Sequence, residues 1–179
     1  EIAYKLDPLS FATANSYFTA LTANYMYDEA ERLMKKVEEN SDGHNRFVIN
    51  RSYFRLYMDQ DDCERAIVPL KEMVKEQNVF NRFLGYCYAK LKDTVSAYNI
   101  IDSIKLRAHP EEKDYQLAVV YSGLGVTDSA LYYLDTTQTK QTRTFKREIN
   151  QHFEYLKDDP RFLEVLKMHG IELNEKSSH

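Results

Sequence analysis

The stretch Leu84-Gly85-Tyr86-Cys87-Tyr88, followed by Ala97-Tyr98-Asn99-Ile100-Ile101, carries the clearest structural pattern in this chain. Apolar residues recur at helical spacing in its first part and again after the polar break at 92–94. Gly85 and Ala97 present small surfaces, which allow two helices to approach each other closely. The stretch therefore predicts a pair of short helices packed together.

A similar pattern occurs in four places along the chain. Each copy has an alanine in its second helix and an apolar residue four positions later. The alanines are Ala30, Ala66, Ala97 and Ala130, and the apolar residues are Met34, Leu70, Ile101 and Leu134. The alanines are separated by 36, 31 and 33 residues, which predicts a structural repeat of about 34 residues. Pro69 lies inside the second copy, where a proline removes a helical hydrogen bond, so this repeat is the weakest of the four.

The pattern Leu-Gly-x2-Tyr followed by Ala-x3-apolar resembles the tetratricopeptide (TPR) repeat. A narrower resemblance lies at the two ends of the chain, in Leu6-Asp7-Pro8-Leu9-Ser10 and in Leu156-x-Asp158-Asp159-Pro160-Arg161-Phe162-x3-Leu166 followed by Gly170-Ile171. These ends are similar to those of TPR arrays fused to bacterial signalling modules, such as winged-helix transcription regulators, nucleotide cyclases and Ser/Thr kinases. The resemblance implies an all-α fold, a right-handed superhelical solenoid of antiparallel helix pairs closed by a C-terminal capping helix.

The same resemblance suggests how the chain is divided. We expect 1–10 to be the tail of a truncated preceding repeat and 11–140 to form four TPR-like helix pairs. We expect 141–173 to form capping helices, which a solenoid needs at its end, and 174–179 to be a disordered tail. An effector domain would then precede Glu1, and the fragment would come from a longer protein.

The composition, 43% hydrophobic and 29% charged, is that of an ordinary globular domain. A net charge of -4 argues against dedicated nucleic-acid binding, which depends on clustered Lys and Arg. No apolar run approaches the roughly 18 residues of a membrane span, and the first residues lack a signal-peptide profile. We therefore expect a cytoplasmic fragment, or a periplasmic one if a transmembrane helix precedes it in the parent protein.

The residues that could carry catalysis do not form a pattern. The five histidines lack metal-ligand spacing, and Gly-x-Gly at 123–125 lacks the strand and third glycine of a dinucleotide loop. The carboxylate pairs at 111–112 and 158–159 fall at helix starts, where capping and the helix dipole explain them. We expect no catalytic residues, no metal and no cofactor, and hence no enzyme.

Two cysteines, Cys63 and Cys87, leave two interpretations open. They are either buried free thiols, which behave as small hydrophobic residues, or a disulfide between adjacent helix pairs, which would indicate an oxidising compartment.

The candidate functional surface is the groove formed by the first helix of each pair. Alignment on the four alanines places Thr19 and Val119 there, together with the residues we assign to a partner-binding groove: Asn15, Arg51, Arg55, Arg82, Tyr86, Lys90 and Tyr115. In type, this set resembles the carboxylate clamps with which some TPR proteins hold acidic peptide tails, although the full clamp is absent. The alternative is a solvated helix face with local ion pairs.

The sequence thus favours a non-catalytic scaffold for protein or peptide interaction, with an acidic partner, within a larger bacterial signalling or regulatory protein. The partner could also be another domain of the same protein. The alternative is a purely architectural array that sets spacing or self-associates into a homo-oligomer through its end repeats.

Overall fold

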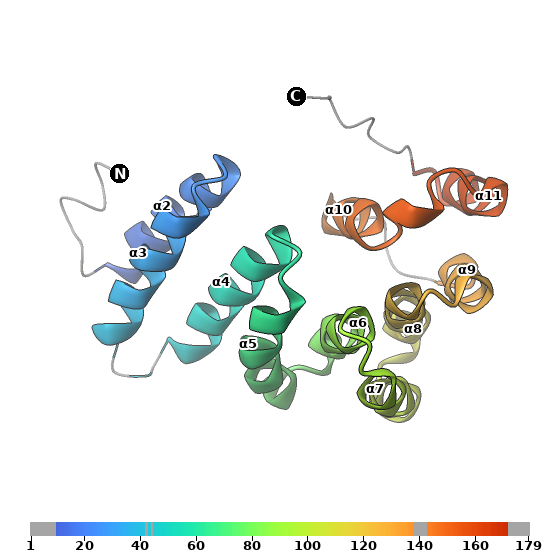
Figure 1. Ribbon diagram of the computed structural model, residues 1–179, viewed down its shortest axis with the longest axis horizontal. Coiled ribbons are helices and arrows are strands. Elements are labelled where there is room, and N and C mark those ends of the chain that lie inside the picture. Colours follow the sequence, from blue (N-terminus) through green and yellow to red (C-terminus); the bar gives the residue numbers. More distant parts are fainter. Residues whose placement is uncertain (1–9, 42, 44, 138–142, 172–179) are drawn as a thin grey trace. The chain divides into compact units, whose positions relative to one another are not determined.

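The computed structural model describes residues 10–41, 43, 45–137 and 143–171, and the regular structure of these residues is entirely helical (Figure 1). The prediction of an all-α protein is confirmed. The chain forms two compact units, Glu1–Gln77 and Asn78–His179. Each unit is described by itself.

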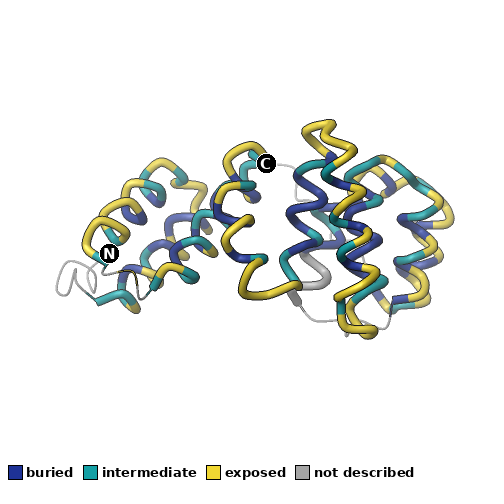
Figure 2. The backbone as a smooth tube through the Cα atoms, turned by 90° about the horizontal axis from the view of Figure 1, so that it is seen from below, coloured by how far each residue is buried: buried dark blue, intermediate teal, exposed yellow. Residues whose placement is uncertain are grey.

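The first unit contains two helix pairs. Its helices are α2 (Phe11–Ala23), α3 (Tyr27–Glu39), α4 (Arg46–Asp59) and α5 (Cys63–Glu76). Each helix packs against the next one along the chain, and their facing sides are buried (Figure 2). The core between α2, α3 and α4 is built from aliphatic and aromatic side chains that include Phe18, Leu21, Leu33, Met34 and Leu56.

The second unit contains two more helix pairs and a C-terminal extension. Its elements are η1 (Asn78–Phe80), α6 (Asn81–Lys90), α7 (Thr94–Arg107), α8 (Pro110–Leu124), α9 (Thr127–Asp135), α10 (Arg143–His152), η2 (Glu154–Leu156) and α11 (Pro160–Met168). Helix α6 packs on α7 and α8, and α8 packs on α9. Of the C-terminal helices, α10 contacts α8 and α11 contacts α9.

In all four helix pairs that the structure describes, the same type of turn connects the first helix to the second. In each turn one residue has a positive φ, and the next N–H donates to the carbonyl five positions earlier. These bonds are Met26 to Leu21 (2.9 Å), Asp62 to Tyr57 (2.8 Å), Asp93 to Tyr88 (2.9 Å) and Val126 to Tyr121 (3.0 Å). The residues with positive φ are Tyr25, Asp61, Lys92 and Gly125. This is the hydrogen bond of a Schellman motif, which ends a helix through one left-handed residue.

The four predicted alanines occupy equivalent places relative to these turns. Ala30, Ala66, Ala97 and Ala130 each follow the left-handed residue by five positions, and all four are fully buried. The apolar residues four positions later are buried as well. The four pairs therefore share a local geometry that follows the sequence alignment.

Gly85 and Pro69 show how the packing is achieved. A Cβ atom on Gly85 would lie 2.7 Å from Val120 Cγ2 and 2.9 Å from Ile100 Cγ2. Gly85 therefore allows α6 to approach α7, as the sequence predicts, and also α8. Pro69 is buried inside α5, which nevertheless runs from Cys63 to Glu76 without interruption.

Helices α2 and α11 begin at side-chain caps, the second of them at the predicted helix start 158–159. The Ser10 side chain caps α2 by accepting from the Thr13 N–H, and Asp159 caps α11 by accepting from the Arg161 N–H at 2.9 Å. Phe162, which α11 directs into the protein, is buried. The predicted truncated repeat before Ser10, the polar segment 138–142 and the predicted tail at 174–179 lie outside the described residues. Among the helices that the structure describes, none is long and apolar enough to span a membrane.

Candidate interaction face

Three of the predicted groove residues of the second unit, Arg82, Tyr86 and Tyr115, lie against α10. Arg82 stands in the first turn of α6, and only 12% of its side chain is exposed. Its Nε and Nη2 each lie 3.2 Å from one carboxylate oxygen of Glu148 on α10. The remaining terminal nitrogen, Nη1, donates to the Val79 carbonyl at 2.7 Å. This is a two-point Arg–carboxylate contact, the geometry that gives such pairs their directionality.

Tyr115 of α8 completes the polar environment of this carboxylate. Its hydroxyl donates to Glu148 Oε2 at 3.2 Å. Burial, reinforced by the negative charge of Glu148, raises the pKa of Tyr115 well above its usual value, so the phenol keeps its proton and acts as a donor. The Arg82 guanidinium also lies 4.2 Å from the centre of the Phe83 ring, within the range of a cation–π contact. Glu148 is thus held by charged and neutral donors from two helices.

One turn after Glu148, α10 makes an aromatic contact. The His152 ring lies 4.5 Å from the Tyr86 ring, in an edge-on arrangement, and 5.6 Å from the Phe83 ring. The Ser122 hydroxyl of α8 donates to the carbonyl of His152, at the last residue of α10. Glu148 and His152 are four residues apart and therefore share one face of the helix. That face of α10 covers the first helices of two successive pairs.

This arrangement corrects part of the sequence prediction. Arg82, Tyr86 and Tyr115 were predicted to line a groove for a partner, but in this structure Tyr86 and Tyr115 are buried and Arg82 is nearly so. Helix α10 covers them. Lys90 is exposed, with its Nζ 6.0 Å from the Tyr86 ring centre. Val119, aligned to the same face, is fully buried.

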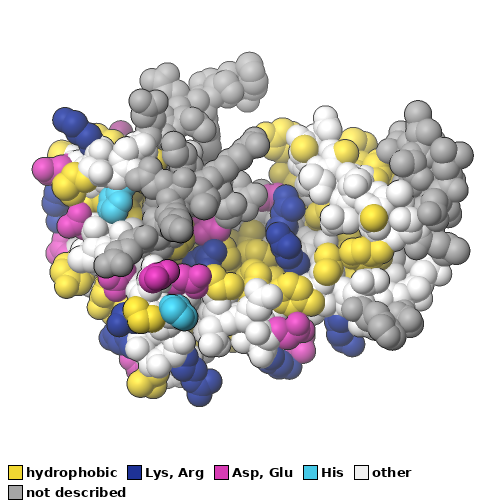
Figure 3. Space-filling model, turned by 180° about the vertical axis from the view of Figure 1, so that it is seen from behind, with side chains coloured by type: hydrophobic (Ala, Val, Ile, Leu, Met, Phe, Trp, Pro, Cys, Tyr) yellow, Lys and Arg dark blue, Asp and Glu magenta, His cyan; other side chains and the backbone are white. Residues whose placement is uncertain are grey.

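The predicted residues of the first unit have a different environment. Asn15 and Thr19 on α2 are exposed, as is Arg51 on α4, whereas Arg55 is half-buried. Asn15, Thr19 and Arg51 are therefore accessible to solvent, and Arg55 is only partly so. Elsewhere on the surface, acidic, basic and hydrophobic side chains are interspersed where the view of Figure 3 shows described residues.

Sequence reasoning missed Glu148, Ser122 and the docking of α10. One signal was present in the sequence. Ile149 and Phe153 are four residues apart, lie next to Glu148 and His152 in the sequence, and are fully buried in the structure. That spacing predicts a helix with one buried edge, but it does not identify the surface that receives it.

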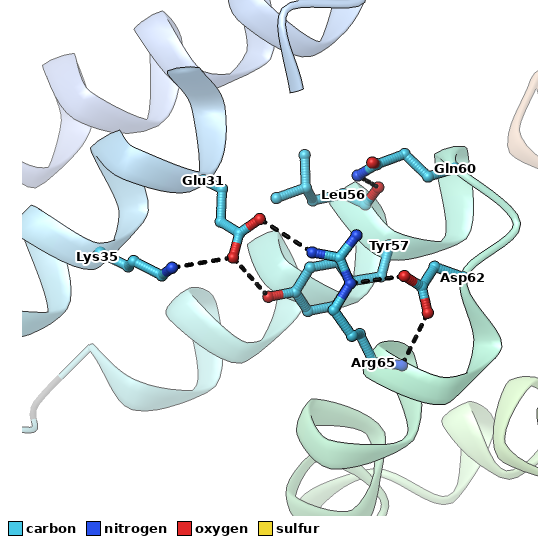
Figure 4. Close-up of polar contacts among 7 residues, drawn as sticks. All are labelled: Glu31, Lys35, Leu56, Tyr57, Gln60, Asp62 and Arg65. Atoms are coloured by element: carbon cyan, nitrogen blue, oxygen red, sulfur yellow. Dashed lines mark hydrogen bonds and ion pairs between the residues drawn. The ribbon is translucent and has the colours of Figure 1, made fainter. Parts of the chain in front are cut away.

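The first unit carries an ion-pair network that connects α3 with α5 (Figure 4). Arg65 Nη1 lies 3.1 Å from Glu31, and Arg65 Nε lies 2.6 Å from Asp62. Glu31 also pairs with Lys35 at 3.2 Å, and the Arg65 guanidinium lies 4.6 Å from the Tyr57 ring centre. The Arg65 N–H and guanidinium hold the pKa of Asp62 below its usual value. None of these ion-paired residues belongs to the predicted groove set, so the network leaves open the alternative of a solvated, ion-paired face for that set.

Cys63 and Cys87 are both buried free thiols and lie in different units. Within the part of the chain that the structure describes, no three His, Cys, Asp or Glu side chains are grouped closely enough to hold a metal ion.

Comparison with known proteins does not assign the chain to a family. No protein-family model matches it, and it has no significant match among curated proteins or among solved structures.

Proposed function

We propose that this chain is a non-catalytic array of tetratricopeptide-like repeats, arranged as a right-handed solenoid, whose first helices bind a protein or peptide. The observation that carries the proposal is the turn that recurs in all four helix pairs, with a left-handed residue five positions before a buried alanine. A repeated helix pair of this kind presents a series of equivalent helices to a partner. The sequence of the two ends supports placing it within a larger bacterial signalling or regulatory protein.

The charges on the first helices suggest an acidic partner. Arg51, Arg55, Arg82 and Lys90 stand on these helices in a chain whose net charge is -4. Arginine is well suited to this task because its planar guanidinium binds a carboxylate at two points. The contact between Arg82 and Glu148 is one instance of such recognition inside the chain itself.

The experiment uses Arg51 and Arg55 on α4 of the first unit, of which Arg51 is exposed and Arg55 is half-buried. We would screen a panel of fluorescein-labelled acidic peptides of about 15 residues by fluorescence anisotropy. We expect some of them to bind the chain more tightly than any lysine-rich peptide of equal length. The double variant Arg51→Glu/Arg55→Glu should weaken binding by about tenfold or more, since it replaces attraction with repulsion.

A matched control is available on α3. Arg32 and Lys36 are also four residues apart and exposed, but they stand on the second helix of their pair. Arg32→Glu/Lys36→Glu makes the same change in net charge and should leave affinity nearly unaltered. Equal losses in both double variants would show that only net charge matters and would remove the first-helix face from the proposal.

A second candidate is self-association through the C-terminal end. Leu163 and Met168 on α11 are 44% and 63% exposed, which favours a contact between copies of the chain. Light scattering should then show a dimer that Leu163→Glu/Met168→Glu converts to monomer. A monomer at all concentrations would eliminate this alternative.

A further inference from the structure

The face formed by α6 and α8 has the features of a site that recognises a carboxylate. Glu148 receives hydrogen bonds from Arg82 Nε, Arg82 Nη2 and the Tyr115 hydroxyl, each at 3.2 Å. Both charged side chains are largely withdrawn from solvent, with 12% of Arg82 and 5% of Glu148 exposed. Because a buried charge is costly unless it is well paired, the arrangement is selective for a negatively charged group at this point.

The same face also recognises the helix that carries the carboxylate. Phe83 and Tyr86 of α6 contact the His152 ring, one turn after Glu148. Ser122 of α8 donates to the His152 carbonyl and so satisfies one of the backbone groups left open at a helix end. The face therefore contacts three features of α10: a glutamate, an aromatic ring four residues later and the carbonyl at the end of the helix.

Helix α10 is attached to the unit differently from the other helices. The second helix of the last pair, α9, is covered by α11, so α10 is not needed to close that side. Helix α10 contacts α8 and η2, and its Glu148 side chain pairs with Arg82 of α6. Its sequence, RTFKREINQH, is mostly polar, and its buried side chains include Glu148, Ile149 and His152.

We infer that the α6–α8 face is a binding site for an amphipathic helix with the pattern Glu-apolar-x-x-ring, and that α10 is its occupant within the chain, which a partner helix displaces. This inference rests on the proposed function and specifies the partner for the second unit. The structure supplies the partner's chemistry, because the bound α10 shows which groups the face accepts. A partner carrying the same groups would compete with α10 for Arg82, Tyr115 and Tyr86.

The covalent connection between α10 and the rest of the unit affects this competition. A segment linked to its site by a short connection has an effective concentration in the millimolar range. A free peptide with the sequence of α10 should therefore bind the unaltered chain weakly, and any change that weakens docking of α10 should increase binding of the free peptide.

The test uses the full chain and a fluorescein-labelled peptide with the sequence of residues 143–157. We expect the Glu148→Gln chain to bind this peptide at least about tenfold more tightly than the unaltered chain. The gain should be absent from the Arg82→Gln/Glu148→Gln chain, and a peptide with Gln in place of Glu148 should bind poorly. Equal and weak binding by all three chains would overturn the inference.

Hydrogen exchange on the unaltered chain provides a second test that does not depend on a variant folding. If α10 is displaceable, its amide protons should exchange about 100-fold faster than those of α8, because α10 opens separately. Exchange of α10 and α8 at the same rate, with the same denaturant dependence, would make α10 a permanent part of the unit and overturn the proposal.

Two further outcomes are informative. If the chain forms a dimer that the free peptide dissociates, the occupant of the face is α10 of a second copy. This result would overturn the inference that a different protein supplies the partner helix. Failure of these tests leaves the proposed function intact if Arg51→Glu/Arg55→Glu still reduces acidic-peptide binding, since those residues lie in the other unit.

Discussion

The two units use similar charged residues in different environments. In the first unit Arg65 pairs with Glu31 and Asp62 at the surface, where 45% of the Arg65 side chain is exposed. In the second unit Arg82 pairs with Glu148, and 12% and 5% of these side chains are exposed. Solvent screens the first network and weakens each of its contacts. The buried pair instead joins α6 to α10 with little solvent around it.

The comparison extends to the first helices themselves. Asn15 and Arg51 in the first unit are exposed, whereas Arg82 and Tyr115 at corresponding places in the second unit are largely buried against α10. The helix pairs share one turn geometry, so the difference does not arise within the pairs. It arises because an additional helix with a complementary carboxylate follows the second unit's pairs in the chain.

The largest effect should come from removing Arg82. Arg82→Leu leaves Glu148 buried without its cationic partner, which costs about 3–5 kcal/mol in typical buried pairs. We expect this cost to destabilise the docked position of α10, so that α10 is released into solvent. The loss of stability cannot exceed the free energy with which α10 docks. Trypsin should then cut at Arg147 in α10 about 100-fold faster, measured by mass spectrometry over time.

The other unit supplies the control for this prediction. Arg65→Leu removes an arginine with two carboxylate partners, but from an exposed network, and should change the free energy of unfolding by about 1 kcal/mol or less. The double variant Arg82→Leu/Glu148→Leu should restore much of the protection of α10, since it removes both buried charges. If Arg82→Leu leaves the rate of cleavage at Arg147 unchanged, the buried pair does not hold α10.

A smaller effect tests the similarity of the helix pairs. Ala97 in the second unit and Ala30 in the first are both fully buried five residues after a left-handed turn residue. Ala97→Leu and Ala30→Leu should therefore each overpack the contact and reduce stability by roughly 1–3 kcal/mol. Urea denaturation followed by circular dichroism measures both changes.

The control is Asn99→Leu, at an exposed position of α7, which should alter stability by no more than about 0.5 kcal/mol. An unchanged unfolding midpoint for Ala97→Leu would mean that the alignment of the four pairs is wrong. A large cost for Ala97→Leu together with none for Ala30→Leu would confine the repeat to the second unit.

The helix pairs were predictable because their signals are local. Small residues such as Ala97, apolar residues at helical spacing and turn residues all act within one pair, and their spacing is visible in the sequence. The docking of α10 was not predictable, since Arg82 and Glu148 are 66 residues apart and no periodic pattern connects them. The alignment placed Arg82 and Tyr115 on the first helices of their pairs, α6 and α8, but it did not show that another part of the chain covers them.

The turns show a similar limit at smaller scale. Of the four left-handed residues, only Gly125 is the residue type that normally marks such a position. Tyr25, Asp61 and Lys92 adopt the same conformation with positive φ between 55° and 65°. Their conformation goes with the packing of the two helices that each turn joins, which the residue type alone does not indicate.

The smallest predicted effect follows from the strain of this conformation. A left-handed backbone costs an L-residue roughly 1–2 kcal/mol, and glycine avoids the cost while losing more conformational freedom on folding. Lys92→Gly in the second unit and Asp61→Gly in the first should therefore each stabilise the chain by up to about 1 kcal/mol. Gly125→Ala should do the reverse, although the space around Gly125 would accept a Cβ atom.

Lys92→Ala separates backbone strain from loss of the lysine side chain. Both variants remove the charge, but alanine keeps the strain, so only Lys92→Gly should raise the urea midpoint. We expect Asp61→Gly to raise the free energy of unfolding less than Lys92→Gly does, because aspartate tolerates the left-handed region better than lysine. If Lys92→Gly and Lys92→Ala change the midpoint equally, the turn at Lys92 stores no strain, and the four turns are alike in shape but not in energy.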